Sequence, residues 1–214
     1  MSAKVEPFQK YHREYEEWFI RNKNVYESEL AAIGKLVPKS GEGLEIGVGS
    51  GRFAEPLGIK HGVEPSKEMA RYALERGVKV IEGVAEKLPY PAKEFDYVVM
   101  ITTICFVDDL DLSLREAYRV LKDNGSLIIG FIDKNSPLGK QYQKYKEQNP
   151  FYRVASFRST EEITEAMRGS GFKGFQYVQT VFRNLEEVRE KEPIKDGYGE
   201  GSFVGIKGIK IEGL

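Results

Sequence analysis

The amino-acid sequence predicts an α/β fold in which a mostly parallel sheet carries helices on both faces. Short apolar runs, typical of buried strands, alternate five times with helical stretches from residue 44 onward. The last two apolar runs, residues 175–182 and 203–211, have only a charged stretch between them. Parallel strands need a crossover connection, usually a helix, so we expect this last pair to be antiparallel at one edge of the sheet.

The first helical region is expected over residues 8–36, and Gly34 and Pro38 mark its end. Its aromatic residues recur at helical spacing among charged ones. They are Tyr11, Tyr15, Trp18 and Phe19.

Later elements are predicted from turn and capping signals in chain order. Pro56 allows only a short or kinked helix, because proline removes an intrahelical hydrogen bond. Ser66 and Ser159 are typical helix N-caps, and Gly77 is a typical stop. Strands are expected at residues 44–47, 59–64, 78–82, 95–101, 126–132, 175–182 and 203–211. Helices are expected at residues 67–76, 111–121 and 159–169, with a turn at 122–125 and a polar excursion beyond the sheet at 138–148.

Composition and charge argue against several classes of function. The 214 residues carry a net charge of −1, so no basic surplus indicates a nucleic-acid partner. One cysteine allows no internal disulfide, and with only two histidines a metal site is not expected. No apolar run approaches the roughly 18 residues of a membrane span, and the first residues lack the apolar core of a signal peptide. We therefore expect a cytoplasmic protein with no membrane partner.

A glycine-rich turn follows the first strand and predicts a cofactor site. Gly47, Gly49 and Gly51 stand at alternate positions, which suits a turn where backbone approaches a ligand closely. Ligands of open α/β sheets bind beyond the carboxyl ends of the strands. Glu45 precedes the turn, and Glu64 ends the second strand 17 residues after Gly47. A carboxylate there can accept both hydroxyls of a ribose.

The order of these motifs resembles the class I S-adenosylmethionine-dependent methyltransferases, in particular the small-molecule type with a Leu-Pro-Phe signature. Glu45–Gly51 is similar to the family's first motif, Glu64-Pro65-Ser66 to its second and Gly83–Pro91 to its third. Phe95–Val99 resembles the next strand, and Leu114–Gly125 resembles the segment that closes the core. The resemblance covers about residues 11–132.

The resemblance implies a Rossmann-like sheet of seven strands whose antiparallel last strand lies beside the fifth. Residues 1–38 would form an N-terminal helical lid, and residues 39–214 would form the cofactor-binding methyltransferase domain as a single globular unit. The implied cofactor is S-adenosyl-L-methionine, and the implied reaction moves its methyl group to an N, O, S or C nucleophile of a small molecule by in-line displacement.

The resemblance also implies a map of the cofactor site. Glu45 would organise the methionine end, Glu64 would hold the ribose, and the threonines after the fourth strand would lie near the sulfonium. The implied cofactor-binding residues are Glu45, Gly47, Gly49, Gly51, Glu64, Pro65, Met69, Val84, Ala85, Glu86, Thr102 and Thr103. Two departures stand out: Val84 replaces a frequent acidic residue, and Ile104-Cys105-Phe106 replaces a stretch that often holds histidine.

Methyl transfer from a sulfonium mainly needs alignment and exclusion of water, and needs a base only where the nucleophile must lose a proton. The candidates for such a role are His12, Tyr11 and Tyr15, although a histidine on a charged helix, such as His12, is more often simply solvated. The two tyrosines resemble aromatic positions of the family's lid. Candidates for a substrate pocket are Tyr142, Tyr145, Tyr152 and Arg153.

Two alternatives remain open at this stage. An NAD(P)-dependent oxidoreductase would need a G-x-G-x-x-G turn that opens a long helix facing the pyrophosphate. Here the third glycine comes one place early, Arg52 stands where that glycine belongs, and Pro56 interrupts the helix. A non-catalytic module that binds S-adenosylmethionine would share every motif.

Overall fold

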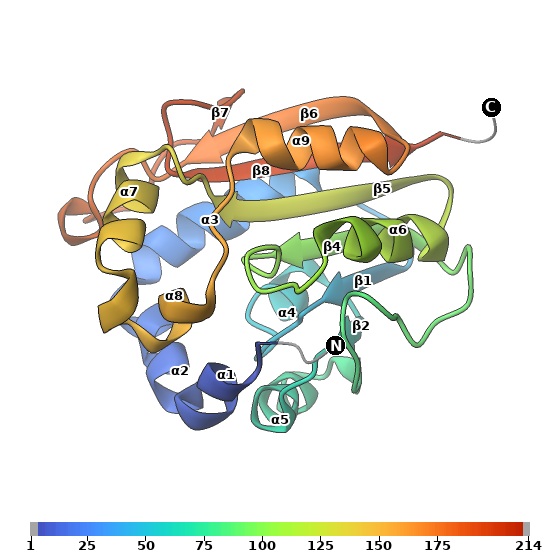
Figure 1. Cartoon of the computed structure of the whole chain (residues 1–214), viewed down its shortest axis with the longest axis horizontal. Coiled ribbons are helices and arrows are strands. Elements are labelled where there is room, and N and C mark those ends of the chain that lie inside the picture. The colour runs from blue at the N-terminus through green and yellow to red at the C-terminus, as the bar shows by residue number, and fades with distance from the viewer. Residues whose placement is uncertain (1–3, 212–214) are drawn as a thin grey trace.

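The computed structural model describes residues 4–211, so the first three residues of the predicted lid and the last three of the predicted domain lie outside it. A single twisted sheet runs through the molecule, with strand order β3-β2-β1-β4-β5-β8-β6-β7 (Figure 1). The parallel strands are β1 (Gly43–Ile46), β2 (His61–Val63), β3 (Lys79–Ile81), β4 (Phe95–Ile101) and β5 (Leu121–Ile132). The others are β6 (Phe172–Thr180), β7 (Lys195–Asp196) and β8 (Phe203–Lys210).

The predicted antiparallel strand pairing is confirmed. β8 lies between β5 and β6 and runs antiparallel to both, with Ile129 opposite Ile206 on one side and Tyr177 opposite the same residue on the other. The prediction of seven strands is wrong, because the described residues form eight. The additional strand β7 is two exposed residues paired with Val178 and Gln179 of β6. So short a charged edge strand carries no apolar pattern that would indicate it.

Helices cover both faces of the sheet. Their bounds are α1 (Glu6–Lys10), α2 (His12–Arg21), α3 (Lys23–Leu36), α4 (Ala54–Leu57), α5 (Lys67–Glu75), α6 (Leu110–Val120), α7 (Pro137–Lys144), α8 (Pro150–Val154) and α9 (Thr160–Gly169), with short 3-10 helices at Lys146–Gln148 and Leu185–Glu187. Pro56 lies in the four-residue α4, as its effect on helical hydrogen bonding predicts. No helix within residues 4–211 has the length and apolar character that crossing a bilayer requires.

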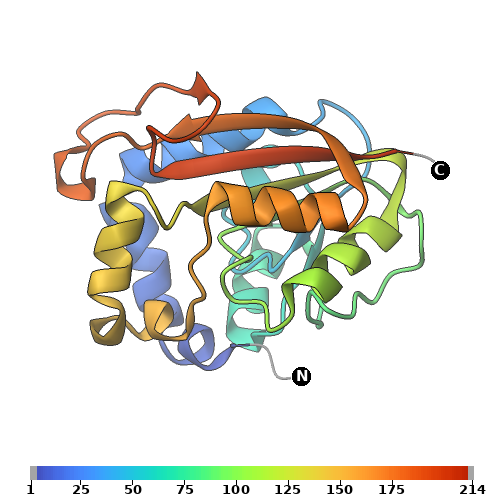
Figure 2. The same ribbon diagram turned by 45° about the horizontal axis from the view of Figure 1, so that its top comes forward.

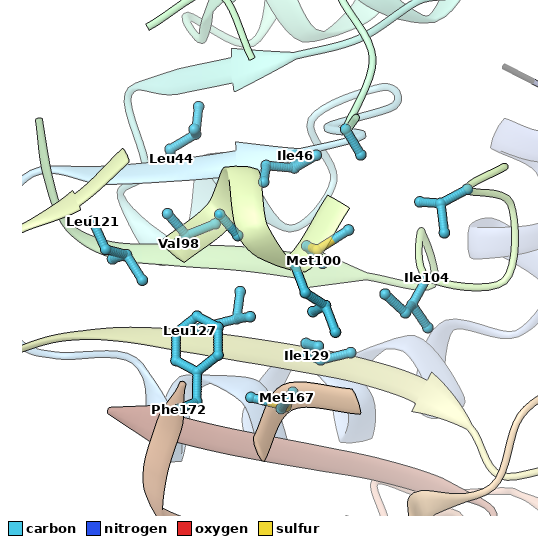
Figure 3. Close-up of a cluster of buried hydrophobic side chains, with 14 of the residues drawn as sticks. Leu44, Ile46, Val98, Met100, Ile104, Leu121, Leu127, Ile129, Met167 and Phe172 are labelled. Carbon is cyan, nitrogen blue, oxygen red and sulfur yellow. The ribbon is translucent and has the colours of Figure 1, made fainter. Parts of the chain in front are cut away.

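The core has two halves, one on each face of the sheet. Strand β4 shows why, since neighbouring side chains of a strand point to opposite faces. Val98 and Met100 pack with α6 and α9 in one cluster, while Val99 and Ile101 pack with α3, α4 and α5 in the other. Figure 3 shows the first cluster, in which Met167 of α9 lies over Ile129 of β5. Burial on both faces explains the continuous apolar run of this strand.

The predicted helix starts at Ser66 and Ser159 are confirmed by their caps. Ser66 accepts from the Met69 N–H at 3.4 Å, and Ser159 forms a reciprocal capping box with Glu162. The predicted start of the fifth strand at residue 126 is wrong. β5 already begins at Leu121, which pairs with Phe95, and the turn residues 122–125 bulge out before pairing resumes at Ser126.

Four helices gather at the carboxyl ends of the parallel strands. α1 and α2 approach from the N-terminal region, and α7 and α8 come from the polar excursion after β5 (Figures 1 and 2). Phe151 of α8 contacts Phe8 of α1 with ring centroids 5.2 Å apart, and it also contacts Tyr15 of α2. Segments distant in sequence therefore cover the edge of the sheet at which ligands of this architecture bind.

Candidate functional site

A cavity of about 520 Å³ lies at the carboxyl ends of the strands, beneath these helices. We divide its lining into two walls. The glycine-turn wall is formed by segments that follow β1, β2, β3 and β4, and it includes Gly47, Gly49, Glu64, Met69 and Ala85. The tyrosine wall comes from α3, α7 and α8, and it includes Glu29, Tyr142 and Tyr152.

The three positions of the turn require glycine for different structural reasons. All have positive φ, +66° at Gly47, +53° at Gly49 and +80° at Gly51. A Cβ on Gly47 would stand 2.4 Å from Thr103 Cγ2, and one on Gly51 would stand 3.1 Å from Ala73 Cα. A Cβ on Gly49 would meet only Met69 Cε and Tyr15 Oη, each at 3.6 Å. Gly47 and Gly49 line the cavity, whereas Gly51 packs against α5 and is not part of the lining.

Glu64 is held in place by backbone N–H groups at the end of β2. Its Oε2 accepts from Gly49 N at 2.8 Å and its Oε1 accepts from Ser66 N at 2.9 Å. Burial raises the pKa of this carboxyl to about 7 even though both hydrogen bonds favour the ionised form. Each carboxylate oxygen has a second lone pair. The side chain can therefore accept two further donors, such as the hydroxyls of a ribose.

Glu45 lies behind the turn and not in the cavity wall. It is only 2% exposed, and its Oε2 has no hydrogen-bond partner among residues 4–211. Burial raises the pKa of the carboxyl well above its usual range, and the negative charge of Glu64 adds to this, against a hydrogen bond from the Ala54 N–H. Glu45 therefore lies beneath the turn, outside the cavity lining, while Glu64 faces the cavity.

The remaining predicted cofactor residues all line the cavity: Pro65, Met69, Val84, Ala85, Glu86, Thr102 and Thr103. Glu86 joins two loops, because its Oε1 accepts from Asp108 N at 2.7 Å and from Asp109 N at 3.2 Å. Thr103 donates to Gly47 O at 3.3 Å, so the segment after β4 is fixed to the glycine turn. These contacts make the glycine-turn wall a set of loops cross-linked by side chain to backbone bonds.

The N-terminal helices bring Tyr11 and Tyr15 into the cavity lining but not His12. His12 Nδ1 lies 3.1 Å from the hydroxyl of Tyr72. Burial raises the pKa of the Tyr15 hydroxyl, and the charges of Glu64 and Glu45 raise it further, so this phenol stays protonated. Tyr15 can thus donate a hydrogen bond but is unsuited to be a base at neutral pH.

Glu16 of α2 fastens the N-terminal region to the residues around the glycine turn. Its Oε2 accepts from Arg52 Nη2 and from Arg76 Nη2, each at 2.7 Å. Burial raises the pKa of Glu16, but the hydrogen bonds from the two arginines outweigh it and hold the pKa below its usual value. Arg52 directly follows Gly51, so this ion-pair cluster links α2 to the turn itself.

The tyrosine wall was only partly predicted from the sequence. Tyr142 and Tyr152 line the cavity with their rings stacked, centroids 4.2 Å apart and planes at 26°. Tyr145 and Arg153 are exposed and do not line it. Glu29 was missed, although its position on the buried stripe of α3 with Val25, Ala32 and Ile33 is a signal visible in the sequence.

Cys105 lines the cavity beside Thr102, whose carbonyl oxygen accepts from its Sγ at 3.1 Å. Burial raises the pKa of the thiol to about 12, so it is not a thiolate nucleophile. Among the described residues, no group of three or more His, Cys, Asp or Glu side chains is arranged to hold a metal ion.

Comparison with known proteins identifies the family. A family model described as a methyltransferase domain matches residues 44–129. The crystal structure of a SAM-dependent methyltransferase from Thermotoga maritima, described as a possible histamine N-methyltransferase, is 52% identical and superposes with a TM-score of 0.95. The match covers 96% of this chain and 99% of that one.

Two further comparisons extend this result. An uncharacterised protein of Methanocaldococcus jannaschii is 46% identical over 204 residues, which cover 95% of this chain and 98% of the relative. A phosphoethanolamine N-methyltransferase of Haemonchus contortus, solved with phosphomonomethylethanolamine and S-adenosylhomocysteine, has a TM-score of 0.64 at 20% identity. That match covers 87% of this chain and 53% of the other, and it shows the shared fold alone.

Proposed function

The chain belongs to the S-adenosylmethionine-dependent methyltransferases, and we propose that it transfers a methyl group to a nucleophilic atom of a small molecule. S-adenosylmethionine is its cofactor. The observation that carries the proposal is one cavity lined both by the glycine-turn wall, with Glu64, and by an aromatic wall from distant helices. One wall suits a nucleoside with a polar tail, and the other leaves room for a second ligand.

The residues of the glycine-turn wall fit this cofactor. Glu64 presents a carboxylate whose spare lone pairs match a vicinal diol, and Gly49 leaves backbone uncovered beside it. Met69 and Ala85, which both line the cavity, offer apolar contacts for a purine ring. We assign the ribose to Glu64 and the adenine to the neighbourhood of Met69, Ala85 and Glu86.

The bound cofactor supplies a methyl group already activated on a sulfonium. What the chain must do is align donor and acceptor and exclude water. The aromatic side chains Phe8, Phe106 and Phe151 form a cover over the cavity that can exclude water. The ring centroid of Phe8 lies 4.9 Å from that of Phe106 and 5.2 Å from that of Phe151. Lys4 closes the same side by donating to Val107 O and Ser156 Oγ, each at 3.4 Å. This cover supports a small acceptor over a macromolecular one.

A screen of methyl acceptors tests the proposal. The purified protein is mixed with S-adenosylmethionine labelled in the methyl group and with amines, phenols, carboxylates and thiols in turn. Amines come first, because the Thermotoga maritima relative is described as a possible histamine N-methyltransferase. Transfer to at least one acceptor is expected. Cofactor binding without transfer to any acceptor would instead indicate a non-catalytic binding module.

The oxidoreductase alternative gains no support from the geometry. A pyrophosphate seat needs a long helix whose N-terminus faces the ligand. Here the helix after the glycine turn is the four-residue α4. Calorimetry with S-adenosylhomocysteine and with NADH separates the two functions, and we expect binding of the first alone.

A further inference from the structure

Glu29 stands out among the buried carboxylates of the cavity because no described residue provides it with a partner. Glu64 and Glu86 each accept two backbone N–H groups. Within residues 4–211, no hydrogen bond or ion pair reaches the carboxylate of Glu29, although the residue is only 4% exposed. A buried carboxylate without a donor is costly, since its water is lost and nothing replaces it.

Tyr142 and Tyr152 line the same cavity as Glu29, and no cation among the described residues compensates the charge of its carboxylate. Burial alone raises the pKa of its carboxyl to about 8, with no cationic group opposing the shift. The charge of Glu29 in turn contributes to the raised pKa of Tyr142 and Tyr152, after the larger effect of burial. The carboxylate and the two stacked rings therefore occupy the same part of the cavity. An ammonium group favours such a place, because it pairs with a carboxylate and is attracted to the faces of aromatic rings.

The cationic side chains that line the cavity do not compensate the charge of Glu29. Lys4 donates to Val107 O and Ser156 Oγ. Arg158 lies close enough to Cys105 for its charge to lower the pKa of that thiol slightly, and Arg21 is exposed at the end of α2. None of the three lowers the pKa of Glu29. A cation that pairs with Glu29 would therefore come from outside the described residues, through the cavity that Glu29 lines.

We propose that Glu29 binds the ammonium group of the methyl acceptor, and that the acceptors are small amines that are protonated in solution. This proposal rests on the proposed methyltransferase function and assigns its substrate class and a specificity-determining residue. Glu29 supplies the charge, and the rings of Tyr142 and Tyr152 supply an apolar, polarisable wall beside it. Neutral analogues of the same shape lack the group that this carboxylate needs.

The test is calorimetric binding of matched ligand pairs to the protein saturated with S-adenosylhomocysteine. The pairs are histamine with histaminol and tyramine with tyrosol, in which an alcohol replaces the amine. For the native protein we expect at least one amine to bind about tenfold or more tightly than its alcohol, the range of a charge-assisted hydrogen bond. Glu29→Gln should reduce that preference to less than about threefold, and Glu29→Asp, which keeps the charge, should retain part of it.

Glu27→Gln is the matched control on the same helix. Glu27 lies outside the cavity lining and pairs with Lys23 at 3.6 Å, so its replacement should leave the preference intact. Three outcomes would overturn the proposal: no amine binds, the alcohols bind equally well, or Glu29→Gln keeps the amine preference. The proposal would also be overturned if Glu29→Gln lost as much affinity for S-adenosylhomocysteine as for the amine, because Glu29 would then belong to the cofactor site. Failure of the native protein to bind S-adenosylhomocysteine would be recognised separately, as failure of the proposed function.

Discussion

The two walls of the cavity treat their carboxylates in opposite ways. On the glycine-turn wall, Glu64 and Glu86 are each held by two backbone N–H groups, so their positions are set by the fold before any ligand arrives. On the tyrosine wall, Glu29 has no such donors within the described residues. A wall that always binds the same cofactor can be built from backbone. The tyrosine wall, which we propose to bind the acceptor, is built instead from side chains of helices distant in sequence.

The largest effect is expected from Gly47→Ala, which breaks the glycine-turn wall. The new Cβ would stand 2.4 Å from Thr103 Cγ2, and the residue must keep a φ of +66°. We expect about 2–4 kcal/mol of lost stability and a loss of S-adenosylhomocysteine affinity of about 100-fold. Thermal unfolding and calorimetry measure both.

Gly58→Ala is the control for backbone strain alone. Gly58 has a φ of +72°, a Cβ added to it would meet no atom within 4 Å, and it lies outside the cavity lining. The substitution should cost about 1–2 kcal/mol of stability and leave the affinity unchanged. Equal affinity losses in the two variants would show that the contact with Thr103 is unimportant.

Glu29→Gln should stabilise the unliganded protein, because it removes from the tyrosine wall the carboxylate that lacks a partner among the described residues. The folded pKa of Glu29, about 8, lies above its usual value of 4.5, so the folded state holds a proton that the unfolded state has lost between these pH values. Stability therefore falls as pH rises through this window. The variant should equal the native protein below pH 4.5 and exceed it by about 2–4 kcal/mol above pH 8. Denaturant unfolding at pH 4, 6 and 9 tests this, and a constant difference across pH would contradict it.

Glu64→Gln should weaken cofactor binding by about 10–100-fold, because a neutral amide replaces a charged acceptor and turns an N–H group toward a backbone N–H. In the native protein, affinity for S-adenosylhomocysteine should fall by up to tenfold per pH unit below about pH 7 as the carboxyl takes up its proton. The variant should lack this slope. Glu68→Gln, an exposed neighbour on α5, is the control and should bind normally.

The smallest effect is expected from Glu16→Gln, which touches neither wall directly. It weakens the bonds to Arg52 and Arg76 that fasten α2, so about 1 kcal/mol of local stability should be lost. Hydrogen exchange should become about fivefold faster in residues 12–21. Glu17→Gln, at an exposed position of the same helix, should not change the exchange.

The glycine-turn wall was largely predictable because its determinants are local in sequence. The spacing of glycines, the acid at the end of β2 and the cap at Ser66 each depend on the chemistry of a few neighbouring residues. The tyrosine wall was not predictable from local sequence, because α3, α7 and α8 meet only in the folded chain. A glutamate in a helix rich in charged residues is ordinarily interpreted as solvated, and only its position between Val25 and Ile33 places Glu29 on the buried stripe.

Strand β8 has a consequence for how the chain is synthesised. It lies between β5 and β6, both of which precede it in the sequence, and it forms hydrogen-bonded pairs with both strands. Until the ribosome has released residues 203–210, β5 and β6 each lack the strand that pairs with them and joins them. The sheet can therefore be completed only after β8 has been synthesised.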